Sequence, residues 1–310
     1  MAEVTKPVVT TFLAVEGIPA ELAVSGPEGE PVRGSVPSYP SPERAVAALA
    51  RVLRYARWRE DPPGEYLRPS GIRRERAEDL VRAHFTQTPV ELSDQVTAEL
   101  LACYGIEVTA FRLVDSVSSA RAAAEELGFP VALKGVGRRW QTRDLIGIRL
   151  DVGSPAAAEQ AYAELVEVTG QPEIYVQQMA PKGSSCVFEV IDDPSFGSLL
   201  SFGLSGIAIE LLADRAYHVI PLSSVDAERL IRAPRAAPLL SGYGGAQPAD
   251  LAALEQLALR VSCLVEDLPE VRSLRLDPVL AAPKQASVTS ARITLGPAPT
   301  RDDTGPRRLR

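Results

Sequence analysis

The chain has 310 residues, of which 45% are hydrophobic, so its length and composition predict a folded protein of about two domains. Its formal net charge of -7 disfavours nucleic acid as a partner, because phosphate backbones are bound mainly by clustered cations. The cysteines Cys103, Cys186 and Cys263 lack CxxC spacing, which argues against a disulfide framework or zinc site and favours a reducing cytoplasm. The longest apolar stretch, residues 202–213, contains Glu210 and is shorter than the roughly 20 residues that span a bilayer, so no membrane partner is expected.

Residues 1–62 are predicted to form a partial α/β segment. The runs "PVVTTFLAV" and "VRGSVPSYP" are typical of strands that end at Gly and Pro. A helix is expected over "SPERAVAALARVLRYARW", where Ser41 suits the N-cap and Pro42 the first helical position. Two strands and one helix cannot cover both faces of a parallel sheet, so this segment is expected to need a partner, which is the rest of the chain, another chain or an upstream segment.

Residues 63–89 are predicted to be a linker with a helix. Pro, Gly and charged residues are frequent in "REDPPGEYLRPSG", as is typical of linkers. In "RRERAEDLVRAHF" the arginines alternate with acids, which indicates a solvated helix face.

Residues 90–296 show a regular order of helices and strands. A helix over "SDQVTAELLACYG" begins at the cap Ser93, and the helix over "SSARAAAEELG" ends at Gly128. Strands are expected in "VTAFRLV", "PVALKGV" and "IGIRLDV", followed by the helix "SPAAAEQAYAELVEVTG" and strands in "EIYVQQMA", "CVFEVIDD" and "SLLSFGL". The helix "PADLAALEQLALRVSCLVEDL" then precedes two strands, "SLRLDPVLA" and "ASVTSARITLG", and residues 297–310 are expected to be a disordered tail.

This order, with phrases such as "GFPVALK", "IYVQQMAPKG" and "DDPSFGSLLSFGLSG", resembles a known family. Residues 90–296 resemble the ATP-grasp domain of NDP-forming acyl-CoA synthetases, and residues 6–60 resemble the end of the succinyl-CoA-ligase-like domain before it. The wording is similar to that of actinobacterial proteins in which this portion is often fused to a Gcn5-type acetyltransferase. The resemblance implies an α/β ATP-grasp fold with two lobes, preceded by a partial Rossmann-like (flavodoxin-like) segment.

The resemblance also implies a chemistry. Active members convert ATP, an acid and CoA to acyl-CoA, ADP and phosphate through an acyl phosphate and a phosphohistidine. The expected ligands are therefore ATP or ADP, with Mg²⁺ bound weakly, and acyl-CoA. The expected partner is a CoA-binding domain or subunit, or else an acetyltransferase domain.

The same resemblance assigns binding residues. Lys134, at the end of a strand, is expected to neutralise nucleotide phosphates. Arg139 in the following loop is expected to hold phosphate or the CoA diphosphate. The remaining expected contacts are an adenine-binding hinge and a glycine loop near phosphate, formed by Val176, Gln177, Gln178 and Met179 and by Gly203 and Gly206.

The sequence departs from the family at the residues that carry the chemistry. Gln141 stands at the position of the phosphoryl-accepting histidine, so no catalytic residue is assigned. Asp277 and Ser290 replace metal ligands, and Arg275 replaces an acid, which predicts a weak Mg²⁺ site at best. Three alternatives stay open: an ATP-binding module of a ligase, a non-catalytic regulatory module that partners an acetyltransferase, and the product of a split or truncated gene.

Overall fold

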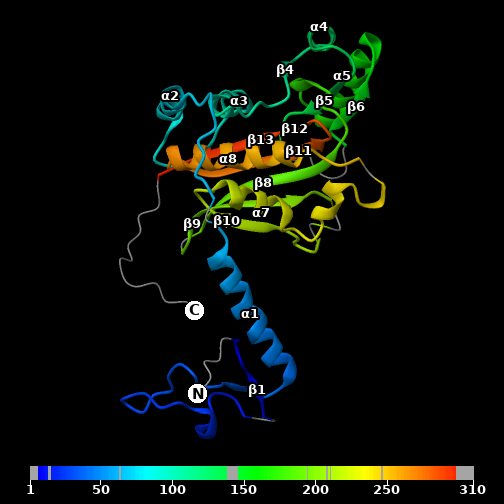
Figure 1. Ribbon diagram of the computed structural model, residues 1–310. Helices are drawn as coiled ribbons and strands as arrows, with labels where there is room; N and C mark the ends of the chain where they lie inside the picture. The colour runs from blue at the N-terminus through cyan, green and yellow to red at the C-terminus, as the bar shows by residue number, and fades with distance from the viewer. Residues whose placement is uncertain are drawn as a thin grey trace. The chain divides into compact units, whose positions relative to one another are not determined.

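The computed structural model describes residues 6–12, 15–62, 64–137, 146–193, 195–206, 209, 211–245 and 247–297. The chain divides into two compact units, Met1–Pro63 and Gly64–Arg310 (Figure 1). Among the described residues, no helix combines the length and the apolar character that a membrane span requires.

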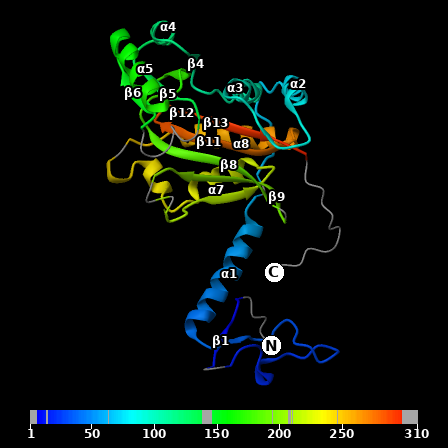
Figure 2. The same cartoon turned by 180° about the vertical axis from the view of Figure 1, so that it is seen from behind.

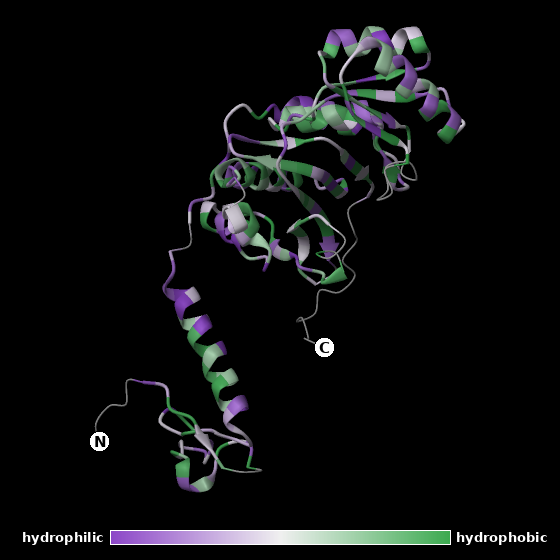
Figure 3. Ribbon diagram, turned by 90° about the vertical axis from the view of Figure 1, so that its right-hand side faces the viewer, coloured by the Kyte–Doolittle hydropathy of each residue, from purple (hydrophilic) through white to green (hydrophobic). Residues whose placement is uncertain are grey.

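The first unit is small and leaves apolar side chains in solvent. Its strands β1 (Thr10–Thr11) and β2 (Ser38–Tyr39) form a parallel pair, and a short 3-10 helix, η1 (Ala20–Leu22), lies between them in the chain. Helix α1 (Pro42–Glu60) begins as predicted, with the Ser41 hydroxyl accepting a hydrogen bond from the Arg44 amide. Only Ala45 is buried on α1, whereas several apolar residues of this helix (Figure 3) are more than half exposed: Val46, Val52, Tyr55 and Trp58.

The second unit is built around a seven-stranded antiparallel sheet. Its strand order is β10-β9-β8-β11-β13-β3, with β12 also paired to β11. The strands are β3 (Val90–Glu91), β8 (Ser184–Asp193), β9 (Gly197–Leu204), β10 (Ala216–Val219), β11 (Val271–Ala282), β12 (Gln285–Val288) and β13 (Ala291–Leu295). Phe188 and Phe202 lie directly opposite each other on β8 and β9, with ring centroids 4.8 Å apart, and belong to the main core.

Helices cover this large sheet (Figures 1 and 2). They are α2 (Arg74–His84), α3 (Asp94–Cys103), α7 (Ser224–Arg232) and α8 (Leu251–Asp267), with the 3-10 helices η3 (Ala237–Ser241) and η4 (Tyr243–Gly245) between α7 and α8. Helix α8 is largely buried, with Leu254, Leu257 and Val261 among its buried residues. The solvated face predicted for α2 is confirmed, since Arg74, Arg76 and Arg82 are exposed. The apolar side of the helix was not predicted: Ala77, Leu80 and Val81 are buried in the main core.

A four-stranded antiparallel sheet forms the other lobe of the second unit. Its order is β4-β7-β5-β6, from β4 (Phe111–Val114), β5 (Val131–Gly135), β6 (Ile148–Val152) and β7 (Ile174–Gln178). Helices α4 (Val117–Leu127) and α5 (Pro155–Thr169) cover one face of it, and together they bury Leu133 and Val176. Because side chains alternate along a strand, Lys134, Tyr175 and Gln177 emerge on the opposite face.

Four elements differ from the sequence prediction. The run "ASVTSARITLG" forms two strands, β12 and β13, which are separated by Thr289 and Ser290. Helix α7 was not predicted, although Ser223 and Asp226 form a capping box at its start. The short strand β3 was not predicted either; it lies directly before the cap Ser93 of α3.

Candidate functional site

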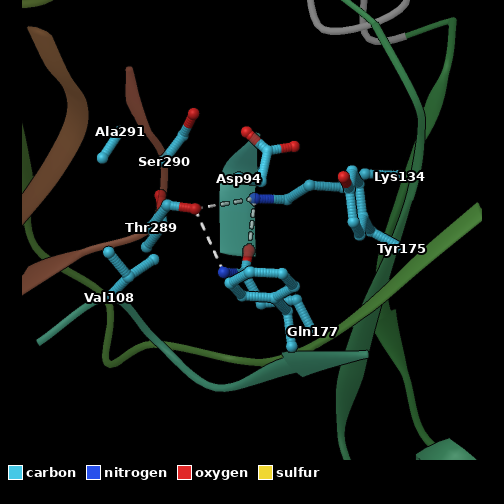
Figure 4. A pocket seen from close by; sticks show the side chains of 9 residues that line it. Asp94, Val108, Lys134, Tyr175, Gln177, Thr289, Ser290 and Ala291 are labelled. Atoms are coloured by element: carbon cyan, nitrogen blue, oxygen red, sulfur yellow. Dashed lines mark hydrogen bonds between the residues drawn. The ribbon is translucent and has the colours of Figure 1, made fainter. Parts of the chain in front are cut away.

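A pocket lies where the open face of the small sheet meets the turn between β12 and β13. Its walls come from α3, β4, β5, β7 and that turn, so both lobes of the second unit contribute. The lining residues, most of which are labelled in Figure 4, are Asp94, Val108, Phe111, Lys134, Tyr175, Gln177, Thr289, Ser290 and Ala291. The structure therefore brings three residues of the predicted site together: Lys134, Gln177 and Ser290.

Lys134 is the cation of this pocket. Its Nζ donates to Gln177 Oε1 at 2.5 Å and to the Thr289 carbonyl oxygen at 3.4 Å (Figure 4). Burial lowers the pKa of Lys134 from its usual value to about 8, and the charge of Asp94 acts in the opposite direction. The ammonium group is therefore still mainly charged at neutral pH, but it lies in an environment that gains from a further anion.

Gln177 connects the two lobes at this point. Only 4% of its surface is exposed. Its Nε2 donates to the carbonyl oxygens of Thr109 at 2.9 Å and Thr289 at 3.1 Å, while its Oε1 accepts from Lys134. A buried amide with its donors and acceptor engaged has one preferred orientation, so Gln177 fixes the position of the Lys134 ammonium.

Tyr175 and Phe111 form the aromatic wall of the pocket. Their rings meet edge to face, with centroids 5.5 Å apart. Burial, a hydrogen bond with Asp94 and the Asp94 charge all raise the pKa of Tyr175, which therefore stays a neutral hydrogen-bonding phenol. A wider groove continues from these two rings along α3 and β4.

A second pocket shares Lys134 and Ser290 with the first. Its other lining residues are Ile148, Arg275, Asp277, Pro278 and Arg292. Arg275 donates to Asp277 Oδ2 from Nη2 at 2.7 Å and from Nε at 3.1 Å. Through Nη1, Arg275 also donates to Glu189 Oε2 at 3.1 Å, and the same oxygen accepts from Arg215 at 2.6 Å. The carboxylates near this pocket are therefore already neutralised by guanidinium groups.

The residues of this second pocket do not fit a magnesium ion. Mg²⁺ prefers several oxygen ligands, usually carboxylates together with substrate phosphates. The predicted ligand Asp277 is instead paired with Arg275. Within the described part of the chain, no group of three or more His, Cys, Asp or Glu side chains is placed to hold a metal. The weak metal site predicted at Asp277 and Ser290 thus has one engaged carboxylate and one hydroxyl.

Comparison with known proteins identifies the family. A family profile described as "ATP-grasp domain" matches residues 86–295. The beta subunit of acetate–CoA ligase (ADP-forming) II from Pyrococcus furiosus is 33% identical over 208 residues, which are 64% of this chain and 88% of that subunit. The chain belongs to the ATP-grasp domain family of ADP-forming acetyl-CoA synthetases.

Two further comparisons extend this assignment. Acetate–CoA ligase (ADP-forming) I of Archaeoglobus fulgidus is 30% identical over 268 residues, which are 84% of this chain, and the chain spans only 39% of that protein. Among solved structures, acetyl-coenzyme A synthetase 1 of Ca. Korarchaeum cryptofilum, in complex with coenzyme A, Ca-AMPCP and HgCl+, matches with a TM-score of 0.63 and 31% identity, covering 71% of this chain and 99% of the other. The predicted α/β ATP-grasp fold is confirmed.

Other predicted contacts lie around the ATP-grasp site rather than in its described pockets. Val176 points into the core of the small lobe, and its backbone pairs with β4 and β5. The amides of Gln178 and Met179 donate to the carbonyl oxygens of Ala110 at 2.9 Å and Pro130 at 3.4 Å. The adenine contacts expected of these residues stay predictions.

The two glycines differ in their surroundings. Gly203 belongs to β9, and a Cβ there would lie 2.9 Å from the Asp214 carbonyl oxygen, so close packing of the backbone accounts for this glycine. Gly206 follows the strand with φ at +139° and open space beside it. The phosphate contact expected of both glycines stays a prediction, and the predicted residues Arg139 and Gln141 lie outside the described residues.

Several lining residues were missed by the sequence reading. Tyr175 had a usable signal, since it lies two positions before Gln177 on a strand and so shares its face. Asp94 and Thr289 had none, because they reach the pocket from segments that are distant in sequence. Only the fold brings them to Lys134.

Proposed function

We propose that this chain is the nucleotide-binding ATP-grasp module of an acid–CoA ligase of the ADP-forming type, and that it has lost phosphoryl transfer. The observation that carries the proposal is Lys134, a half-buried cation held at the junction of the two lobes by Gln177 and Thr289. A desolvated ammonium group at the wall of a cleft suits the phosphates of a nucleotide.

The pocket around Lys134 offers the other features that a nucleotide requires. Phe111 and Tyr175 supply an aromatic wall against which a planar base can pack, and Asp94 supplies a hydrogen-bond acceptor. When bound, ATP would supply the phosphoryl group for activation of an acid. The residues of this chain would bind the nucleotide and orient its phosphates.

Loss of phosphoryl transfer follows from two features. Phosphoryl transfer depends almost entirely on positioned charge and metal ions. Gln141 cannot accept a phosphoryl group as a histidine does, and the Asp277 carboxylate is paired with Arg275 instead of being free for a metal. Nucleotide binding requires neither feature, so we propose that binding remains without turnover.

The partner of this module is proposed to be a CoA-binding domain or subunit. The Archaeoglobus relative is a single longer protein, the Pyrococcus relative is named as a beta subunit, and the Korarchaeum structure contains coenzyme A. A second candidate, favoured by the same Arg275–Asp277 pair, is a non-catalytic regulatory module that senses nucleotide or acyl-CoA for a Gcn5-type protein acetyltransferase.

Calorimetric titration of the purified chain with ATP and ADP tests this proposal. We expect measurable binding at millimolar nucleotide, and Lys134→Ala should weaken it at least about tenfold because the cation that faces the phosphates is removed. Lys284→Ala, at an exposed lysine outside the pockets, is the matched control and should bind as the parent chain does.

Two results would contradict the proposal in different ways. Equal binding by the parent chain and Lys134→Ala, or no heat with either nucleotide, would remove the nucleotide site. Formation of ADP in step with acetyl-CoA from acetate, CoA and ATP would show that phosphoryl transfer is retained.

A further inference from the structure

The second pocket contains an excess of positive charge. Lys134, Arg275 and Arg292 line it, together with one carboxylate, Asp277. Arg275 is paired with that carboxylate. Across the described residues, Arg292 has no ion-pair or hydrogen-bond partner, although it is only partly exposed.

The large sheet places two of these arginines side by side. Arg275 on β11 lies directly opposite Arg292 on β13 in the antiparallel register. Directly opposed residues have Cβ atoms roughly 5 Å apart, and like charges in that arrangement destabilise a sheet. Arg275 is paired with Asp277 and also with Glu189, whose oxygen Oε2 accepts from Arg215 as well. These carboxylates leave the charge of Arg292 without a described counter-charge. An anion between the arginines and Lys134 would remove the repulsion.

The same arrangement disfavours a divalent cation. A metal ion at Asp277 would have to displace both hydrogen bonds from Arg275 and would then lie beside three cationic side chains. Guanidinium groups, by contrast, hold phosphate through paired N–H donors and stay charged at all physiological pH values.

We propose that Lys134, Arg275 and Arg292 bind the diphosphate group of a ligand directly, without a divalent cation. The inference rests on the proposed nucleotide site, because Lys134 and Ser290 form the shared wall of the two pockets and would place a diphosphate next to the aromatic wall. A diphosphate could belong to a nucleotide or to CoA. Inorganic pyrophosphate represents the shared chemistry, and ADP and CoA distinguish the two sources.

The test is calorimetric titration of the full chain with pyrophosphate, ADP and CoA, each in EDTA and in excess Mg²⁺. We expect pyrophosphate and one of the two larger ligands to bind in EDTA at least as tightly as in Mg²⁺. Arg292→Gln should weaken binding in EDTA about tenfold, whereas Arg292→Lys should retain part of it. Arg235→Gln, at an exposed arginine outside both pockets, should leave all affinities unchanged.

Arg275→Gln provides a second, independent variant. Without the Arg275 guanidinium group, the Asp277 carboxylate is free to bind a metal ion. We therefore expect pyrophosphate to bind this variant more weakly in EDTA and to recover part of its affinity in Mg²⁺, which the parent chain does not show. Circular dichroism and a thermal transition would confirm that each variant is folded. If Arg292→Gln does not fold, Arg292→Lys takes its place in the binding test.

The outcomes separate this inference from the proposed function. Binding of ADP that requires Mg²⁺ would overturn the inference and leave the nucleotide site intact. Binding in EDTA that is unchanged in Arg292→Gln and Arg275→Gln would overturn it as well. Absence of binding by pyrophosphate, ADP and CoA in both buffers would remove the inference and the nucleotide site together.

Discussion

Lys134 shows how much a single residue of the site owes to the fold. Its position at the end of "PVALK" could be predicted from the sequence, because a strand end followed by a turn is recognisable. The environment of Lys134 could not be predicted from the sequence. Gln177 holds the ammonium, Thr289 adds a carbonyl and Asp94 adds a charge, and these three residues come from a different strand, a turn and a helix. The lowered pKa is a property of that assembly.

This pKa makes nucleotide affinity depend on pH. Below pH 8 the Lys134 side chain is protonated in the free protein and can pair with phosphate; as the pH rises through about 8 it loses its proton, and affinity must fall. We expect the association constant for ADP to decrease by up to about tenfold per pH unit between pH 8 and 9.5, the limit for one linked proton. Calorimetry in buffers of different ionisation enthalpy measures the constant and the proton uptake.

Lys134→Arg is the control for this dependence. A guanidinium group stays charged over the whole range, so the variant should bind ADP with an affinity that is flat from pH 7.5 to 9.5. A parent chain whose affinity is equally flat would show that the Lys134 charge does not contribute to binding.

At the scale of elements, caps and periodicity identified most helices, whereas the turns that shape the site escaped prediction. Ser41, Ser93 and Ser154 each accept a backbone hydrogen bond at a helix start, as short polar caps do. The run from 286 to 296 was predicted to be one strand, but it turns at Thr289 and Ser290. Turns without Gly or Pro carry a weak sequence signal, and this one supplies two lining residues.

Gly203 on strand β9 allows a test of whether this glycine is needed for close packing or for nucleotide binding. A Cβ at this position would lie 2.9 Å from the backbone oxygen of Asp214, which must then shift. We expect Gly203→Ala to lower the free energy of unfolding by about 1–3 kcal/mol, the usual cost of overpacking, without changing nucleotide affinity. Urea denaturation and ADP titration measure the two effects. A variant of unchanged stability that binds ADP more weakly would instead support the phosphate contact predicted for this glycine.

At the scale of the whole molecule, the site depends on contacts between segments that are distant in the sequence, whereas the described part of the first unit buries one apolar residue, Ala45. The pocket joins α3, β4, β5, β7 and the turn after β12, a set that spans nearly 200 residues from Asp94 to Ala291 and that no local pattern could assemble. The sequence did predict that residues 1–62 contain too few elements for two covering layers. In the structure, a two-stranded parallel pair and one helix account for the regular strands and α-helix of the described part of this unit.

Helix α1 of the first unit is expected to be far less stable than the helices of the second unit. Val46, Val52, Tyr55 and Trp58 are more than half exposed on α1, and Ala45 is the one buried residue of that helix. Helical stability in proteins comes mainly from packing of an apolar face, so α1 should open readily in the isolated chain. Hydrogen exchange followed by mass spectrometry should therefore show rapid exchange over residues 42–60 and slow exchange over α8, whose Leu254 and Val261 are fully buried. Exchange on α1 as slow as on α8, in a preparation shown to be monomeric, would contradict this prediction, whereas protection that appears only when a CoA-binding domain or subunit is added would place the missing layer on that partner.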